Sequence, residues 1–233
     1  MILIYSAAFF LAASIVSFFN LYDDRRRRGE NWIKGRSRCE SCGCSIPWPY
    51  LIPVIGYGLC RGRCTCGVKI PLYHPLSEGI GGALVVFFMH HMGVATDSIS
   101  FVVALFAMYL LALEDIRHRD VFTKDLVACG MIFVSVLIFN GSFHPLSGAF
   151  MLCLIGALYF LFPKAVGEGD IYYAALLASG VGGIWRSYLF FTASFVSAAL
   201  IGGGLYFFKI CKQKAVPMFP FFLWAFLLVA LFL

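Results

Sequence analysis

The chain has 233 residues, of which 61% are apolar and only 13% are charged, and its formal net charge is +6. Soluble domains carry about 25% charged residues, so this composition excludes an ordinary soluble protein. It indicates instead an all-α protein that crosses a membrane several times.

Eight apolar runs are separated by polar breaks, and each predicts one transmembrane helix, for which about 20 residues are needed. The run that follows Asp170 is the shortest and is rich in Ala and Gly. In chain order the predicted spans are 2–22, 75–92, 97–114, 125–141, 146–163, 171–184, 187–208 and 216–233.

The first apolar run differs from a secretory signal, because no basic residues precede it and no small-residue cleavage site precedes the arginines. We therefore expect it to remain as the first span. The predicted domains are this span (1–22), a cytoplasmic Cys-rich loop (23–74) and a seven-span membrane domain (75–233).

Lysine and arginine residues predict the orientation, because basic residues are retained on the cytoplasmic side. With the N-terminus outside, alternate breaks are cytoplasmic and hold 17 of the 18 basic residues, which leaves only Arg186 outside. The positive charge therefore needs no nucleic acid to explain it, and contact of the arginines at 25–28 with anionic lipid is a further expectation. The predicted cytoplasmic segments are 23–74, 115–124, 164–170 and 209–215.

Six of the nine cysteines fall in the loop 23–74. Because thiols are kept reduced in the cytoplasm, this grouping favours metal binding over a disulfide framework. The other three cysteines lie in or beside apolar runs and are expected to be packing residues: Cys129, Cys153 and Cys211.

Two cysteine pairs in this loop predict a structural zinc site. Cys39 and Cys42 form a C-x-x-C knuckle, and Cys64 and Cys66 form a tighter C-x-C pair. Four thiolates can surround one tetrahedral zinc ion, which would stabilise a loop too small for a core of its own. Free thiols are the alternative to a metal, and the alternative ligands are Cys44 and Cys60.

Acidic residues gather at two of the predicted cytoplasmic breaks, beside apolar spans, where ionisable groups are costly and often functional. Asp170 is alternatively a helix cap, and Asp115 is alternatively a helix-end acid paired with arginines. Both fall on the same predicted face, so packed helices would bring the two carboxyls together. Such a pair can share a proton, activate water and polarise a peptide carbonyl without a metal. Gly167 and Gly169 would let an extended substrate approach the backbone.

The ordered set of motifs resembles the type IV prepilin peptidase family. The segments that carry the resemblance are SFFN at 17–20 with RRRRGENW, RSRCESC at 36–42, IPWPYLIPVIGY at 46–57, GRCTC at 62–66, YHPLSE at 73–78, LEDIRHRDVFTKD at 113–125, GEGD at 167–170 and VPMFPFF at 216–222. On these motifs the two active-site aspartates of the family map to Asp115 and Asp170.

The resemblance implies an eight-span aspartic peptidase of the bacterial inner membrane, with its active site on the cytoplasmic face. It implies cleavage of the short basic leader of prepilins or pseudopilins, which serve type IV pili or type II secretion. The new N-terminal amine would then be methylated with S-adenosylmethionine as donor, and the loop 23–74 is the favoured place for that step. The alternatives are a peptidase without methylation, a methyltransferase without peptidase activity, and a metal-responsive transporter, which acids confined to one face disfavour.

Four departures from the family's pattern stand out. The second cysteine pair is one residue short, and Tyr172 stands where Lys is common. Phe219 stands where Gly is usual. The family's Ile-Pro-Asn or Leu-Pro-Asp after the first aspartate is replaced by Val121, Phe122 and Thr123.

Glu114 and Asp120 compete with Asp115 for the role of first aspartate. Glu114 lies about 100° round the helix from Asp115, so the two cannot face the same partner. Asp120 is flanked by basic residues and is expected to be a solvated, paired charge. The resemblance favours Asp115.

Overall fold

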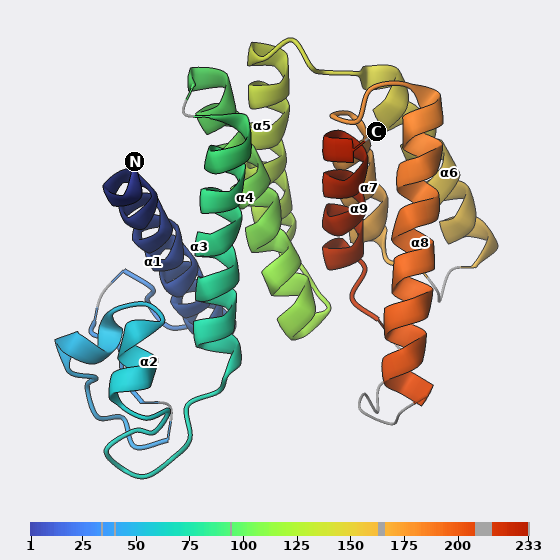
Figure 1. Cartoon of the computed structure of the whole chain (residues 1–233). Helices are drawn as coiled ribbons and strands as arrows, with labels where there is room; N and C mark the ends of the chain where they lie inside the picture. Colours follow the sequence, from blue (N-terminus) through green and yellow to red (C-terminus); the bar gives the residue numbers. More distant parts are fainter. Residues whose placement is uncertain (34, 40, 94, 163–165, 208–215, 233) are drawn as a thin grey trace. The chain divides into compact units, whose positions relative to one another are not determined.

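The computed structural model describes residues 1–33, 35–39, 41–93, 95–162, 166–207 and 216–232, which are helical or irregular apart from two isolated β-bridges. The all-α prediction is therefore confirmed for these residues. Cys211 and the predicted break at 209–215 lie outside them. The elements in chain order are α1 (Ile2–Arg27), η1 (Trp48–Leu51), α2 (Ile55–Leu59), α3 (Tyr73–Met92), α4 (Thr96–His118), α5 (Thr123–Phe139), α6 (Pro145–Leu161), α7 (Glu168–Ala178), α8 (Ile184–Phe207) and α9 (Phe219–Phe232) (Figure 1).

Each of the eight predicted spans overlaps one of the longer helices, α1 and α3 to α9. Three described segments are long and apolar enough to cross a membrane by length and composition: Ile2–Arg27, Thr96–His118 and Ile184–Gly204. Pro145–Leu161 and Phe219–Ala230 are apolar but shorter. These apolar helices indicate a membrane protein.

Helix α7 is shorter than the span predicted at 171–184. Its 11 residues extend about 16 Å, roughly half of the hydrocarbon thickness of about 30 Å. The helix gives way to a turn in which Gly182 and Gly183 have φ angles of +79° and +93°. Residues with a Cβ rarely adopt this conformation, so the two glycines suit the turn that separates the end of α7 from the start of α8.

Contacts divide the chain into two compact units, Met1–Val102 and Val103–Leu233, with the boundary inside α4. In the first unit α1 packs along α3. A Cβ on Gly82 would lie 2.6 Å from the ring of Phe9, so only glycine allows this close approach. A buried hydrogen bond from Asn20 Nδ2 to Ser77 Oγ (3.0 Å) also joins the two helices. The loop with η1 and α2 connects this helix pair, so both of its ends are anchored.

In the second unit α7 contacts α5, α6 and α9 (Figure 1). Its Tyr173, Ala174 and Leu177 side chains are fully buried. Small residues permit the close approach: a Cβ on Gly130 of α5 would lie 2.9 Å from Leu176, and one on Gly148 of α6 would lie 3.1 Å from the Ala175 carbonyl oxygen. The short helix that carries Asp170 is therefore the centre of its unit.

Candidate functional site

Asp115 lies near the C-terminal end of α4 and is only 7% exposed. Its Oδ2 accepts a hydrogen bond of 2.9 Å from the backbone N–H of Phe219, the first residue of α9. The two residues are 104 positions apart in sequence, so this bond fixes the start of α9 against the end of α4. The carboxyl group is thus both buried and held in one orientation.

Asp170 is the third residue of α7, and Gly167 is the residue that caps the helix. The Oδ2 atom of Asp170 accepts the N–H of Gly167 at 2.9 Å. This contact is one half of a capping box, because Gly167 has no side chain to supply the other half. The alternative view of Asp170 as a cap is therefore correct in part: the carboxylate caps the helix from its third position.

The ring of Phe219 links the two aspartates. It stacks on Tyr173 of α7, with ring centroids 3.9 Å apart and an interplanar angle of 13°. A Cβ on Gly169 would lie 3.4 Å from the Phe219 ring, so a glycine there lets the ring approach the turn that carries Asp170. Asp170 lies close enough to Asp115 for the charges of the two carboxyls to interact. The structure therefore brings together Asp115 and Asp170, which the motifs had singled out.

Glu114 and Asp120 have different surroundings. Glu114 is 1% exposed, and its Oε1 accepts the backbone N–H of Phe122 at 3.2 Å, at the turn before α5. Asp120 is exposed in that turn. Glu114 and Asp115 therefore contact different partners, Phe122 and Phe219, as their positions round the helix predicted.

The cysteine cluster lies in the first unit. The sulfur atoms of Cys39, Cys42, Cys64 and Cys66 all lie within 4.8 Å of one another. The Cys39–Cys66 and Cys42–Cys64 sulfur pairs are each separated by 3.9 Å. Around a tetrahedral zinc with Zn–S bonds of about 2.3 Å, the sulfurs would be about 3.8 Å apart, so the four thiols fit this ion.

Two similar hairpins present these four sulfurs. Isolated β-bridges pair Arg38 with Ser45 and Arg63 with Lys69. Each hairpin turns at a glycine of positive φ, +70° at Gly43 and +84° at Gly67. The glycine N–H donates to the carbonyl oxygen of the first cysteine in each hairpin, Cys39 or Cys64. The second hairpin is one residue shorter than the first. Its own glycine turn nevertheless directs the sulfurs of Cys64 and Cys66 to the cluster.

Two thiols of this cluster have pKa values that are shifted in opposite directions. The pKa of Cys64 is lowered to about 6, chiefly by a hydrogen bond from the Cys66 backbone and then by the Thr65 hydroxyl. The pKa of Cys42 is raised to about 12: the Cys44 backbone lowers it, but hydrogen bonds with neighbouring thiols, first that of Cys66, outweigh this effect. Clustered thiols resist carrying charge together, and a divalent cation removes that conflict because each bound thiol is a thiolate.

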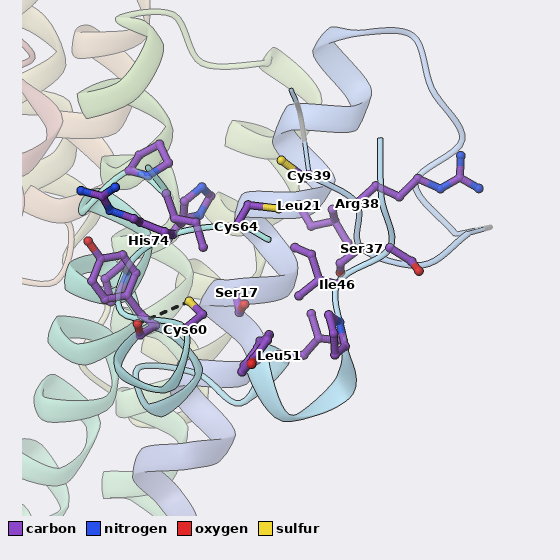
Figure 2. A pocket seen from close by; sticks show the side chains of 18 of the residues that line it. Ser17, Leu21, Ser37, Arg38, Cys39, Ile46, Leu51, Cys60, Cys64 and His74 are labelled. Atoms are coloured by element: carbon purple, nitrogen blue, oxygen red, sulfur yellow. Dashed lines mark hydrogen bonds between the residues drawn. The ribbon is translucent and has the colours of Figure 1, made fainter. Parts of the chain in front are cut away.

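The two alternative ligands are placed differently. Cys60 donates its S–H to the carbonyl oxygen of Tyr57 at 3.4 Å (Figure 2). Among the described residues, neither Cys60 nor Cys44 belongs to the group of sulfurs within 4.8 Å of one another. Of the predicted packing residues, Cys129 is half-buried and Cys153 is exposed.

Comparison with known proteins agrees with these features. A family model of the Bacterial Peptidase A24 N-terminal domain matches residues 10–92. A prepilin leader peptidase/N-methyltransferase of Myxococcus xanthus is 28% identical over 192 residues, which cover 78% of this chain and 56% of that protein. Both comparisons support the type IV prepilin peptidase family.

Other prepilin leader peptidase/N-methyltransferases match over a similar extent. A prepilin leader peptidase/N-methyltransferase of Neisseria gonorrhoeae is 28% identical over 186 residues (74% of this chain, 64% of that protein). One of Pseudomonas putida is 24% identical over 195 residues (79% and 67%). The chain thus spans a little over half to two thirds of the length of these relatives. No solved structure matches the chain.

The family's motifs did not reveal one contact of the site, the bond from the Phe219 backbone to Asp115. Phe219 lies in the segment VPMFPFF, which is one of the motifs that carry the resemblance. The motif does not show what this segment contacts, because every residue except proline has a backbone N–H and the side chain does not reveal where that N–H donates.

Proposed function

We propose that this chain is a membrane aspartic peptidase that removes the leader of type IV prepilins or pseudopilins and methylates the new N-terminus. The names of its relatives support prepilin processing and methylation in general. The observation that carries the aspartic class is the pair Asp115 and Asp170, since each carboxylate is oriented by a backbone N–H and the two interact.

The proposed cleavage uses one charged and one protonated carboxyl. The charged carboxylate takes a proton from a water molecule, whose oxygen then bonds to the scissile carbonyl carbon. The protonated carboxyl donates its proton toward the carbonyl oxygen. When the tetrahedral intermediate collapses, the C–N bond breaks, the leader keeps a carboxyl group, and the mature chain leaves with a protonated amine. Two like charges at close range favour this shared-proton state, because both carboxyls cannot ionise easily.

Zinc and S-adenosylmethionine are the proposed cofactors. Zinc would be held by Cys39, Cys42, Cys64 and Cys66, whose spacing and thiol chemistry fit it, and it would stabilise the loop. The methyl donor supplies an electrophilic methyl group to the amine of the cleaved chain. That amine must be neutral to react, and since an α-amino group has a pKa of about 8, only a small shift is required.

We further propose that the protein lies in the bacterial inner membrane with its N-terminus outside and both aspartates on the cytoplasmic side. The asymmetry of the basic residues supports this orientation. The leader of a membrane-bound prepilin would then meet Asp170 at the membrane edge.

The experiment that tests the proposed function is co-expression with a prepilin, followed by mass spectrometry of the prepilin N-terminus. The wild-type chain is expected to yield a shortened product that is heavier than the unmethylated form by the mass of one CH₂ group. Asp115→Ala and Asp170→Ala are each expected to leave the leader attached. A shortened but unmethylated wild-type product would support the peptidase-only alternative, and leader removal by either variant would refute the two-aspartate mechanism.

A further inference from the structure

Glu114 is a buried acid of the second unit that the proposed cleavage does not use. It precedes Asp115 near the C-terminal end of α4, and it is only 1% exposed. Removing a carboxylate from water is costly unless hydrogen-bond donors satisfy it. What Glu114 binds therefore shows what this acid does beside the proposed catalytic residue.

Phe122 provides one of the contacts of the Glu114 carboxylate. Its backbone N–H donates to Glu114 Oε1 at 3.2 Å. The carbonyl oxygen of Phe122 accepts the N–H groups of Asp125 and Leu126, at 2.9 and 3.0 Å, in the first turn of α5. Phe122 is thus bonded to α4 through its N–H and to α5 through its carbonyl group, so Glu114 fixes the start of α5 to the end of α4.

The turn between α4 and α5 is strained. Arg119 follows the last residue of α4 and has φ +55°, a left-handed conformation that residues with a Cβ rarely adopt. Its N–H donates to the carbonyl oxygen of Asp115 at 2.8 Å. A strained residue persists only where the surrounding contacts enforce its conformation. The bond between Glu114 and Phe122 spans this turn, so it is one of the contacts that hold the strained backbone in place.

Two adjacent carboxyls therefore tie α4 to two different helices. Asp115 accepts the backbone N–H of Phe219, the first residue of α9. Glu114 accepts that of Phe122, the residue that caps the start of α5. Both α9 and α5 pack against α7, the helix that carries Asp170. A displacement of α5 would therefore move α7, and with it the second aspartate relative to the first.

We propose that Glu114 is a positioning residue of the aspartate pair. Its bond to Phe122 sets the turn that places α5, and the packing of α5 on α7 sets the separation of Asp115 and Asp170. Glu114 itself transfers no proton. This inference rests on the proposed function, and it also explains why position 122 is not the proline that is usual in the family, since proline has no N–H to donate.

The test is leader removal by purified full-length variants in lipid nanodiscs, measured as kcat and KM with a synthetic prepilin. Glu114→Ala removes the acceptor and is expected to lower kcat by about 10- to 100-fold at a nearly unchanged KM, because a displaced catalytic group slows the chemical step. Glu114→Gln keeps a carbonyl oxygen that accepts the same N–H, so its kcat is expected to stay within about threefold of wild type. Asp115→Asn, by contrast, is expected to lose at least about 100-fold, which separates a positioning acid from one that transfers a proton.

A second pair of variants changes the donor. Phe122 has φ −64° and ψ 128°, values that proline adopts without strain, so Phe122→Pro removes the N–H and keeps the backbone conformation of this residue. Its kcat is expected to fall by at least about tenfold, because the buried carboxylate loses a donor. Phe122→Ala is the matched control, since it removes the ring but keeps the N–H, and its kcat is expected to stay within about threefold of wild type.

The double variant Glu114→Leu with Phe122→Pro removes both partners at once. Each single change leaves one polar group of the pair without the other, whereas replacing both is often nearly neutral. The double variant is therefore expected to cleave at least about fivefold faster than Phe122→Pro alone. With Glu114→Leu as the other single variant, this cycle measures the coupling of the pair apart from any other contact of Glu114. Thermal unfolding of each variant shows that rates are compared on folded protein.

Low kcat in Glu114→Ala and Phe122→Pro, with recovery in Glu114→Gln and in the double variant, supports the proposal. Wild-type kcat in Glu114→Ala and Phe122→Pro overturns it and leaves the proposed peptidase intact. A loss in Glu114→Gln as large as that in Asp115→Asn also overturns it, because Glu114 would then belong to the proton transfer.

The remaining outcomes are equally decisive. Additive losses in the double variant overturn the proposal, because the two residues would then act independently. If Phe122→Pro does not fold, a folded and active double variant supports the pair, and a double variant that also fails to fold overturns it. A wild-type chain that removes no leader overturns the proposed function and this inference together.

Discussion

At the scale of single residues, two adjacent acids at the end of α4 accept hydrogen bonds from the backbones of two different phenylalanines. Asp115 takes its hydrogen bond from the Phe219 backbone, whereas its neighbour Glu114 takes one from the Phe122 backbone. A proline, which the family usually has at the Phe122 position, could not donate that bond. The departure at this turn therefore comes with a contact to Glu114 that only a residue with an N–H can make.

The Phe219 position offers a test of the backbone contact. Phe219→Gly keeps the N–H and is expected to retain leader cleavage, although loss of the stacking on Tyr173 should lower the thermal unfolding temperature. Phe219→Pro removes the N–H at the first helical position, where proline is otherwise tolerated, and should slow cleavage by about 10- to 100-fold. Rates of leader removal with purified prepilin measure both effects. Equal rates for the two variants would mean that the bond does not orient Asp115.

At the scale of elements, the sequence predicted which side chains would cluster, but it did not predict the backbone turns that bring them together. The C-x-x-C and C-x-C pairs were enough to predict the four-cysteine cluster. The turn that compensates for the missing residue was not predictable, because it depends on the positive φ of Gly43 and Gly67. The length of α7 was missed as well, since a continuous Ala- and Gly-rich run does not reveal that the helix stops at Ala178.

The cysteine hairpins yield a prediction about metal content. The purified wild-type protein is expected to contain one zinc per chain, and Cys39→Ser or Cys64→Ser should reduce it to near zero, because each removes one of four ligands. Elemental analysis of the purified variants gives the measurement.

Cys44→Ser and Cys60→Ser are the matched controls, since their sulfurs lie outside the cluster. Both are expected to keep their zinc. If Cys44→Ser lost the metal while Cys39→Ser kept it, the ligand set would be wrong.

At the scale of the whole molecule, the apolar runs predicted the order and type of the helices, because a helix satisfies all the hydrogen bonds of a backbone that water cannot reach. The contacts that form the sites could not be predicted from the sequence in the same way. Asp115 and Phe219 are 104 residues apart, and no local pattern reveals such a pair. The two candidate aspartates lie in the unit Val103–Leu233, and the cysteine cluster lies in the unit Met1–Val102.

The predicted orientation can be measured with alkaline phosphatase fused after successive breaks of the chain. Fusions after Ser142 or Gly183 should be active, because the positive-inside rule places these breaks outside, where the enzyme folds. Fusions after Asp120 or Gly167 should be inactive. The opposite pattern would place both aspartates outside and would contradict a cytoplasmic active site.

The central claim is that Asp115 and Asp170 act as one catalytic unit, and the rate of leader removal by purified single and double variants tests it most directly. Asp115→Asn and Asp170→Asn are each expected to lower the rate by at least about 100-fold, since each removes one of the two groups that transfer protons. The double variant should be no slower than the worse single variant, because groups that act as a unit are not additive. Asp120→Asn, which changes an exposed acid near Asp115, should cleave at the wild-type rate. Wild-type cleavage by Asp115→Asn or Asp170→Asn would contradict the account.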